Sequence, residues 1–285
     1  MKILILGGSG FLGTYLKKFF KNKNVKFLTS GRHKNNDIVL KNYQNENLNK
    51  LIINYNPTSI INLVAVTKVD ICEKKKILSK KINTIISKNL SEIIIRNKLE
   101  SKLIYVSTDQ VYSGYGKKSE KFIKIINHYS RTKYDAEKYV LKSKGCVLRT
   151  NFFGKSKSKD SLVDWIITSN KKKKKINVFN NVYFSPLYVK TVCRYIYLAC
   201  RKNLKGIYNL GSNDCISKAE FAFYIVKKLK LENKYLINSK YTEDKLIAKR
   251  PRNMCMNSNK FYKKLNIKSK NSYQELNLML RDLVT

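Results

Sequence analysis

The sequence predicts an α/β fold in which a doubly wound parallel sheet is followed by a smaller C-terminal α/β lobe. Strand-like apolar runs alternate with helical spacing of apolar residues through about the first half of the 285 residues. Such alternation is typical of a parallel sheet covered by helices on both faces. A glycine cluster directly follows the first apolar run, at the position where a doubly wound sheet makes its first tight turn.

The alternation can be followed element by element as far as residue 149. Strands are expected at residues 2–6, 25–28, 59–65, 103–107 and 146–149. Helices are expected at residues 11–20, 48–55, 77–96 and 129–142. The second of these helices ends before Pro57, because the residue before a proline is disfavoured in the helical conformation. These elements form a domain that we place at residues 1–152.

Beyond residue 152 the pattern is less regular and predicts a second lobe. Helices are expected at residues 162–168, 189–200 and 218–229, and a strand at residues 206–210. Ser217 is a candidate N-cap for the third of these helices. We predict that residues 153–285 form mainly this smaller lobe, while segments within about residues 176–211 return to the core of the first domain.

The charge is strongly positive, with 59 basic residues against 19 acidic ones and a net charge of +40. The lysines are spread over nearly every segment, together with abundant Asn and Ile, which AT-rich codons encode. A nucleic-acid surface usually clusters arginines and interleaves them with aromatic residues. We therefore attribute the charge to codon composition and expect no specific nucleic-acid partner. The alternative, polyanion binding centred on residues 171–175, predicts association that weakens steeply with salt.

Cysteine usage and hydropathy point to an intracellular protein. The six cysteines form no C-x-x-C pair, and with only two histidines no zinc-site spacing can be assembled. We expect reduced, mostly buried thiols and no metal site. No apolar run approaches the roughly 20 residues of a membrane span, and the N-terminus does not resemble a secretory signal. The expectation is a soluble cytoplasmic protein without a membrane partner.

The glycine cluster has the spacing of a phosphate-binding loop. Residues 7–13 read GGSGFLG, so that glycines stand at the first, fourth and seventh positions. Glycines there allow a tight turn, close approach of backbone N–H groups to a pyrophosphate, and close helix packing. The following helix directs its positive end at the phosphates. Placed between a strand and a helix, the motif predicts a Rossmann-type dinucleotide-binding domain. Its candidate cofactor-binding residues are Gly7, Gly10, Phe11, Leu12 and Gly13.

The end of the second strand bears on which nicotinamide cofactor is bound. Enzymes that use NAD usually place an Asp or Glu there, against the ribose 2′-hydroxyl. Here no carboxylate occurs before Asp37. Ser30 and Arg32 are instead suited to hold a 2′-phosphate, with Lys34 nearby. We therefore predict NADPH as the cofactor, with NADH as the alternative.

A tyrosine and a lysine are placed for acid–base chemistry on one helix face. Tyr129 and Lys133 are four residues apart and so lie on the same side of the predicted helix. An ammonium group beside a phenol favours the phenolate and lowers the tyrosine pKa from its usual value near 10. Such a tyrosine can donate a proton to a carbonyl oxygen while hydride arrives. Thr108, at the end of the fourth predicted strand, supplies a hydroxyl for the same oxygen.

The ordered series of motifs resembles the extended short-chain dehydrogenase/reductase superfamily, and most closely the dTDP-4-dehydrorhamnose reductase family. The resemblance spans nearly the whole chain, and its order is more specific than any single motif. The segments that carry it are residues 7–13, 62–65, 69–73, 107–114, 129–133, 148–154, 185–189, 206–211 and 250–253.

This resemblance implies an NAD(P)H-dependent reductase of a nucleotide-linked 4-keto-6-deoxy sugar, serving surface polysaccharide or glycoconjugate synthesis. By analogy Thr108 polarises the C4 carbonyl, Tyr129 donates the proton, and Lys133 holds the nicotinamide ribose. The second lobe is then the substrate-binding lobe. Further cofactor contacts are implied at Asn62, Leu63, Val64 and Ala65. Substrate contacts are implied at Thr67, Val69, Asp109, Asn151 and Arg252.

Departures from the family pattern leave alternatives open. Gln110 stands where the reductases usually have tyrosine, related dehydratases glutamate, and epimerase–reductases a cysteine acid–base. Val66 replaces a common aromatic residue, and the loop before Tyr129 is short. The alternatives are a sugar-nucleotide epimerase and a non-catalytic cofactor-binding regulatory subunit, because the β subunit of methionine adenosyltransferase resembles the same family. The nucleotide, the sugar and the oligomeric state stay open, with a homodimer as one alternative.

Overall fold

The computed structural model describes residues 1–40, 43–242 and 247–284, and contacts between Cα atoms divide the chain into two compact units. Unit 1 consists of Met1–Thr108, Asn127–Arg149 and Cys193–Tyr208. Unit 2 consists of Asp109–Ile126, Thr150–Val192 and Asn209–Thr285. The chain therefore passes from one unit to the other several times. The late segment of unit 1 falls within the range 176–211 that the sequence analysis assigned to the first domain.

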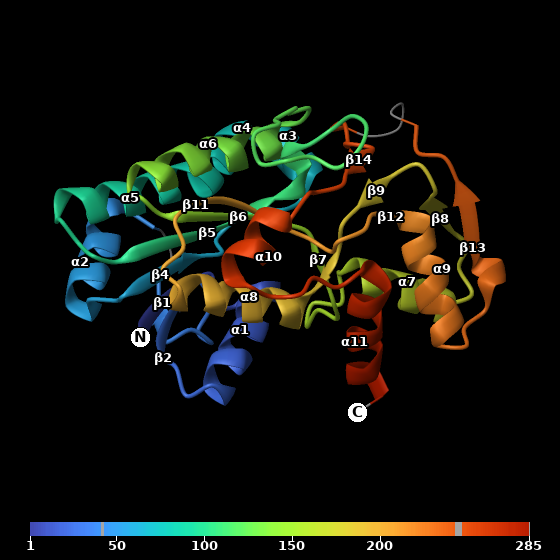
Figure 1. The fold of residues 1–285 in the computed structure, drawn as a ribbon, viewed down its shortest axis with the longest axis horizontal. Helices are drawn as coiled ribbons and strands as arrows, with labels where there is room; N and C mark the ends of the chain where they lie inside the picture. Colours follow the sequence, from blue (N-terminus) through green and yellow to red (C-terminus); the bar gives the residue numbers. More distant parts are fainter. Residues whose placement is uncertain (41–42, 243–246, 285) are drawn as a thin grey trace. The chain divides into compact units, whose positions relative to one another are not determined.

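Unit 1 is built on a seven-stranded sheet (Figure 1). In spatial order its strands are β11 (Gly206–Leu210), β6 (Cys146–Thr150), β5 (Lys102–Thr108), β4 (Ser59–Asn62), β1 (Lys2–Leu6), β2 (Lys26–Gly31) and β3 (Ile38–Val39). The pairs β1–β2, β1–β4, β2–β3 and β4–β5 are parallel. The direction of winding reverses between β1 and β4, which is where such sheets bind ligands. The predicted doubly wound α/β fold is confirmed.

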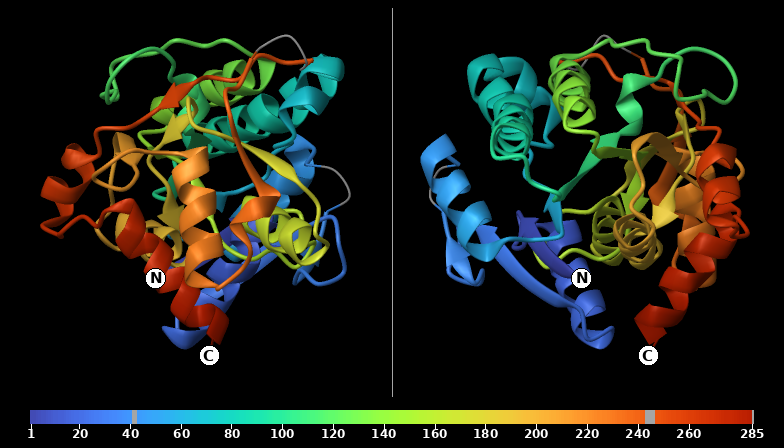
Figure 2. Two further views of the ribbon diagram at one scale, coloured as in Figure 1. Left: turned by 90° about the vertical axis from the view of Figure 1, so that its right-hand side faces the viewer. Right: turned by 60° about the vertical axis from the view of Figure 1, so that its left-hand side comes forward.

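Apolar side chains hold helices to both faces of this sheet. Helices α2 (Asn45–Tyr55), α5 (Ile86–Arg96) and α6 (His128–Lys142) cover one face, and their buried residues Leu48, Leu90 and Val140 belong to one cluster with strand side chains. Figure 2 shows α5 and α6 side by side on this face. The other face carries α1 (Phe11–Asn22) and α8 (Val189–Arg201), where the Tyr197 ring packs on Phe19 and Phe20.

Two elements of unit 1 differ from their predicted form. The strand expected at residues 59–65 ends at Asn62, because the Asn62 side-chain oxygen accepts a hydrogen bond from the Val64 N–H at 3.0 Å and turns the chain. The helix expected at residues 77–96 follows the short helix α3 (Val69–Lys74) and runs as α4 (Lys76–Lys80), a π-helical turn (Lys81–Ile85) and α5. Single π-turns within α-helices are frequent at functional sites.

Unit 2 consists of small sheets packed with helices. The sheets are β10 (Leu187–Tyr188) with β7 (Phe152–Phe153), β13 (Leu236–Ser239) with β8 (Ile176–Phe179), and the order β12 (Ile216–Ser217), β9 (Tyr183–Phe184), β14 (Asn253–Met254). The helices are α7 (Leu162–Lys171), α9 (Lys218–Lys228), α10 (Asn259–Leu265) and α11 (Ser272–Val284), with 3₁₀ turns at Asp109–Val111 and Asn233–Tyr235. The expected N-cap is confirmed, since Ser217 and Glu220 form a capping box at α9.

The expectation that all six cysteines are reduced is wrong for one pair. Cys215 and Cys255 form a disulfide, and Cys72, Cys146, Cys193 and Cys200 are free and buried. Cys215 directly precedes β12 and Cys255 directly follows β14, and these two strands flank β9 in the three-stranded sheet. The two cysteines are 40 residues apart in sequence, so no local motif marks them. In the described part of the chain, every helix is too short or too polar to cross a bilayer.

Candidate active site

The glycine loop after β1 makes the tight turn that its spacing predicts. The Gly7 N–H donates to the Ser30 carbonyl at 2.8 Å, and the Gly10 N–H donates to the Gly7 carbonyl at 3.1 Å. Gly7 has a φ of +86°, in the region that favours glycine. A Cβ atom on Gly13 would lie only 2.4 Å from the Gly7 carbonyl oxygen. Since α1 begins at Phe11 without an acidic residue in its first turn, its N-terminus is suited to an anion.

The end of β2 lies beside this loop and carries the residues predicted to select the cofactor. Ser30 is buried and holds Gly7 through its carbonyl, and its hydroxyl has no hydrogen-bond partner among the described residues. Arg32 is exposed. The nearest carboxylate, Asp37, accepts hydrogen bonds from the Thr29 N–H and hydroxyl at 2.7 and 2.8 Å. Arg32, directly after the strand, is thus exposed to solvent, while the Asp37 carboxylate is bound by the strand itself.

The turn after β4 packs against the glycine loop. A Cβ on Gly7 would lie 3.2 Å from backbone atoms of Leu63 and Val64, so these two connections are in van der Waals contact. Asn62 is buried, and its side-chain nitrogen donates to the Ser87 hydroxyl at 3.0 Å. The structure therefore brings the predicted cofactor residues 62–65 to the switch point together with residues 7–13.

Asn83, which the sequence analysis did not single out, ties this turn to α6. It lies in the π-helical turn and is fully buried. Its side-chain oxygen accepts from the Val66 N–H at 2.8 Å, and its nitrogen donates to the Val66 carbonyl and the Thr132 hydroxyl at 3.2 and 3.1 Å. Thr132 lies between Tyr129 and Lys133. The sequence signal was an amide on the buried face of an amphipathic helix.

The three predicted catalytic residues lie on β5 and α6. Thr108 ends β5, while Tyr129 and Lys133 are one turn apart near the start of α6, and all three are buried. Asn127 caps this helix by accepting from the Ser130 N–H at 2.8 Å, which fixes where α6 begins. The Lys133 ammonium donates to the Val106 carbonyl at 2.7 Å, two residues before Thr108. It also lies 4.1 Å from the centre of the Tyr105 ring.

Burial places the titration of Lys133 near neutral pH. Desolvation lowers the pKa of Lys133 from 10.5 to about 7, and the negative charge of Glu137 and the Cys72 thiol oppose this. A buried lysine with a displaced pKa, one helical turn from a tyrosine, is the kind of group that functional sites use.

Unit 2 contains a cavity of about 310 Å³. Its wall is largely apolar and includes Trp165, the single tryptophan of the chain. Lys218 and Arg250 add two cations. Burial lowers the pKa of Lys218 to about 8, which the negative charge of Asp109 opposes. The arrangement suits a ligand with a flat apolar part and an anionic part.

Of the predicted substrate residues, the structure brings some to this cavity and leaves others away from it. Asn151 lines it and donates to the Asp109 carboxylate at 2.7 Å. Arg252 is exposed, whereas Arg250, two residues earlier, lines the wall. In unit 1, Thr67 is exposed and Val69 is buried in α3.

With this geometry established, comparison with known proteins identifies the family. A model described as the RmlD substrate binding domain matches residues 1–285. The chain belongs to this RmlD family. The resemblance to dTDP-4-dehydrorhamnose reductases inferred from the ordered motifs is thereby confirmed at the level of the family.

Relatives within and around the RmlD family have two kinds of name. A dTDP-4-dehydrorhamnose reductase of Aggregatibacter actinomycetemcomitans is 28% identical over 276 residues, 91% of each chain. The methionine adenosyltransferase 2 subunit beta of Xenopus laevis is 29% identical over 254 residues, 82% of this chain and 74% of that protein. The crystal structure of the Bacillus anthracis dTDP-4-dehydrorhamnose reductase in complex with NADP is 25% identical, with a TM-score of 0.87 and 99% of each chain covered.

Proposed function

We propose that this protein is an NAD(P)H-dependent reductase of a nucleotide-linked 4-keto-6-deoxy sugar, serving surface polysaccharide or glycoconjugate synthesis. One observation carries the proposal. In a member of the RmlD family, Lys133 bonds to β5 two residues before Thr108 and lies one helical turn after Tyr129. These are the groups that ketone reduction requires, and they belong to the sheet whose switch point carries the glycine loop.

The proposed chemistry assigns one task to each of the three side chains. The nicotinamide supplies hydride to C4 of the keto sugar when it is bound. Tyr129 donates its phenolic proton to the C4 oxygen, and Thr108 donates a hydrogen bond to the same oxygen. The Lys133 ammonium stabilises the phenolate that remains and holds the ribose of the cofactor. The reduced sugar leaves as the alcohol, and solvent restores the tyrosine proton.

The residues present fit a dinucleotide, and NADPH is the favoured form. The open N-terminus of α1 and the glycine loop suit a pyrophosphate. Arg32 directly follows β2, where a 2′-phosphate would be expected, and Asp37 is held by Thr29. The NADP complex of the Bacillus anthracis relative supports the same choice. NADH is the alternative.

Gly13→Ala is expected to weaken NADPH binding at least tenfold. The added Cβ meets the Gly7 carbonyl at 2.4 Å, and because the obstacle is backbone, the loop must shift away from its phosphate-binding shape. Asn22→Ala is the matched variant, since Asn22 is exposed at the far end of the same helix and leaves the loop unchanged. Titration of NADPH fluorescence with both variants measures the difference. Wild-type affinity in Gly13→Ala would contradict the placement of the cofactor.

The cavity of unit 2 is the proposed site of the nucleoside diphosphate. Trp165 and Phe179 offer faces for a base, while Lys218 and Arg250 offer cations for the diphosphate. Asn151 and Gln110 line the same cavity, and the carboxylate partner of Asn151, Asp109, directly follows Thr108 in the chain. Asp109 of unit 2 and Thr108 of unit 1 are thus neighbours in the chain.

Because Trp165 is the single tryptophan, its emission reports on this cavity without a label. Adding dTDP, UDP, GDP or CDP is expected to change the emission, and the nucleotide with the highest affinity identifies the natural one. The nucleoside without phosphates is expected to bind at least tenfold more weakly, since it cannot engage Lys218 and Arg250. Lys218→Met should reduce that ratio. Unchanged emission with all four nucleotides would rule out this site.

The proposed activity is tested by NADPH oxidation in the presence of 4-keto-6-deoxy sugars linked to dTDP, UDP, GDP or CDP. One of these substrates is expected to be consumed, and a parallel assay with NADH measures the cofactor preference. Analysis of the product at C3, C4 and C5 distinguishes simple reduction from epimerisation. Absence of oxidation with every substrate, by protein that binds NADPH, would overturn the reductase assignment.

A second candidate is a non-catalytic subunit that binds the cofactor. The match to methionine adenosyltransferase 2 subunit beta, at 29% identity, favours it. The two candidates differ in their demand on Tyr129, because only a reductase needs its proton. The retained set of Thr108, Tyr129 and Lys133 therefore favours the reductase. If the protein oxidised no NADPH but formed a stable complex with a separate catalytic subunit, the subunit candidate would be favoured.

A further inference from the structure

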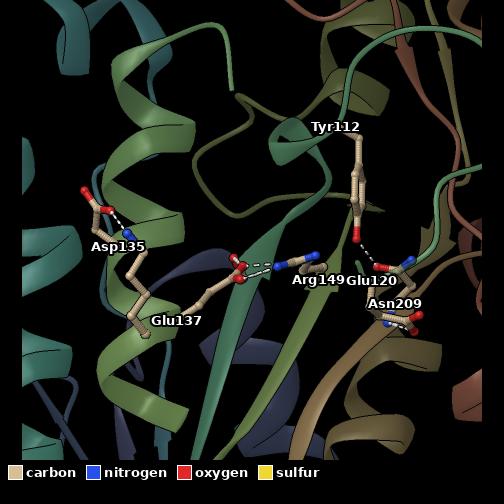
Figure 3. Close-up of polar contacts among 8 residues, drawn as sticks. Tyr112, Glu120, Asp135, Glu137, Arg149 and Asn209 are labelled. Atoms are coloured by element: carbon tan, nitrogen blue, oxygen red, sulfur yellow. Dashed lines mark hydrogen bonds and ion pairs between the residues drawn. The ribbon is translucent and has the colours of Figure 1, made fainter. Parts of the chain in front are cut away.

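A buried ion pair joins α6 to β6 within unit 1. Glu137 and Arg149 are each 1% exposed. The Arg149 Nε donates to both carboxylate oxygens of Glu137, at 3.0 and 3.1 Å, and Nη2 donates to Oε2 at 2.5 Å. Figure 3 shows the two side chains meeting between the helix and the strand, while Asp135 of the same helix points the other way, to its own lysine partner.

The pair touches the segments that carry the proposed catalytic residues. The Ser107 hydroxyl donates to Oε1 of Glu137 at 2.5 Å, and Ser107 directly precedes Thr108. Glu137 also follows Lys133 by four residues on α6, so the two side chains lie on the same helix face. Tyr129, Lys133 and Glu137 thus form one stripe of the helix, with Arg149 at its end.

The titratable groups near Lys133 come from several elements. They are Glu137 and the Cys72 thiol, whose charges act on Lys133, and the Tyr105 phenol on β5, whose ring lies beneath it. Tyr129 lies one helical turn away on α6. Arg149 on β6 neutralises Glu137. Burial raises the pKa of Tyr105 well above its usual value and raises the pKa of Cys72, so both are uncharged at neutral pH. Among these neighbours, Glu137 with its partner Arg149 therefore carries formal charge at neutral pH.

We propose that Glu137 and Arg149 are positioning residues that set the protonation of Lys133, and through it the pH range in which Tyr129 acts as an acid. For its kinetic consequence the proposal rests on the proposed reductase function. A buried ion pair contributes little to stability compared with apolar side chains of similar size. Glu137 lies one turn beyond Lys133 and bonds to Ser107, the residue before Thr108. This position gives the ion pair an electrostatic role instead.

The two members of the pair act on Lys133 with opposite signs, and this makes the test decisive. Glu137→Gln leaves the Arg149 cation uncompensated, which disfavours the Lys133 ammonium. Arg149→Met leaves the Glu137 carboxylate uncompensated, which favours the ammonium. The double variant Glu137→Gln/Arg149→Met restores the balance of charge. A role in packing alone predicts no such opposition, since both single variants then lose the same contact.

The measurement is the pH titration of the Lys133 side chain, followed by NMR of protein labelled at the lysine Cε. Ordinary lysines titrate near 10.4, so one that titrates near 7 is resolved from them, and Lys133→Met assigns the signal. We expect the midpoint to fall by about one pH unit in Glu137→Gln, to rise by about one in Arg149→Met, and to return in the double variant. Shifts of the same sign, or none, would overturn the proposal.

Additional variants keep the test independent of folding and of the reductase assignment. Each single variant predicts its own direction, so one that folds is sufficient. Arg149→Lys keeps the charge but loses the two-pronged contact, and it is expected to retain the wild-type midpoint. The titration needs neither cofactor nor substrate. If the midpoints shift in opposite directions but the protein oxidises no NADPH, the electrostatic role is upheld and the reductase function is rejected. If the protein oxidises NADPH but the midpoints do not shift, the reductase function is upheld and the electrostatic role is rejected.

Discussion

Tyr129→Phe is expected to lower kcat for NADPH oxidation by a factor of about 10² to 10⁴, the usual contribution of a general acid. The substitution removes only the phenolic hydroxyl, so the buried ring still packs at the start of α6. Affinity for NADPH is expected to change little, because the cofactor is held mainly by the glycine loop and Lys133. Stopped-flow oxidation and NADPH titration measure the two quantities separately.

Tyr134→Phe is the matched control on the same helix. Tyr134 is half-buried and carries Lys138 over its ring. The proposed reaction assigns no role to its hydroxyl. Wild-type kcat is expected for this variant. Undiminished kcat in Tyr129→Phe would remove the proposed proton donor and with it the mechanism.

Lys133→Met is expected to reduce kcat/KM at least a hundredfold but to raise the free energy of unfolding at neutral pH. The lost ammonium no longer stabilises the phenolate or holds the ribose, so both kcat and NADPH affinity fall. In the wild type, the pH profile of kcat/KM should decline above about pH 7, where Lys133 of the free protein loses its proton. Lys138→Met, at an exposed position on the same helix, is the control and should keep full activity.

The stability effect of Lys133→Met follows from the lowered pKa of the buried ammonium. The unfolded chain binds this proton up to about pH 10.4, whereas the folded protein releases it near 7. Below pH 7 the cost of burying the charge is fully present, and it is relieved as the pH rises toward 10. The variant should therefore exceed the wild type in free energy of unfolding at neutral pH, by on the order of 4 kcal/mol, and the gap should close by about pH 10. Urea unfolding at both pH values measures it, and a gap that widens with pH would contradict the burial of the ammonium.

Features written in local patterns could be predicted from the sequence. The apolar runs of β1, β5 and β6 stand out because both faces of a parallel sheet are buried. The glycine loop could be placed because its spacing lies between a strand and a helix. Tyr129 and Lys133 could be paired because a helix brings residues four apart together.

Features that depend on contacts between distant segments could not be predicted. The end of β4 follows from the Asn62 side chain, which accepts from the Val64 N–H and is held in place by its bond to Ser87, 25 residues away. Asn83 shows its role only through Val66 and Thr132. The motif at residues 250–253 offers two arginines, and no local pattern tells which one turns toward the cavity. That choice is made by the tertiary packing of the segment.

The covalent bond between Cys215 and Cys255 has a bearing on ligand capture in unit 2. Lys218 lies three residues after one of these cysteines, and Arg250 lies five residues before the other. The two cations of the cavity therefore belong to segments that are tethered together close to both of them. Because the disulfide already restricts the segments that carry Lys218 and Arg250, binding an anion orders little more of the chain. The cavity is therefore preorganised for its ligand.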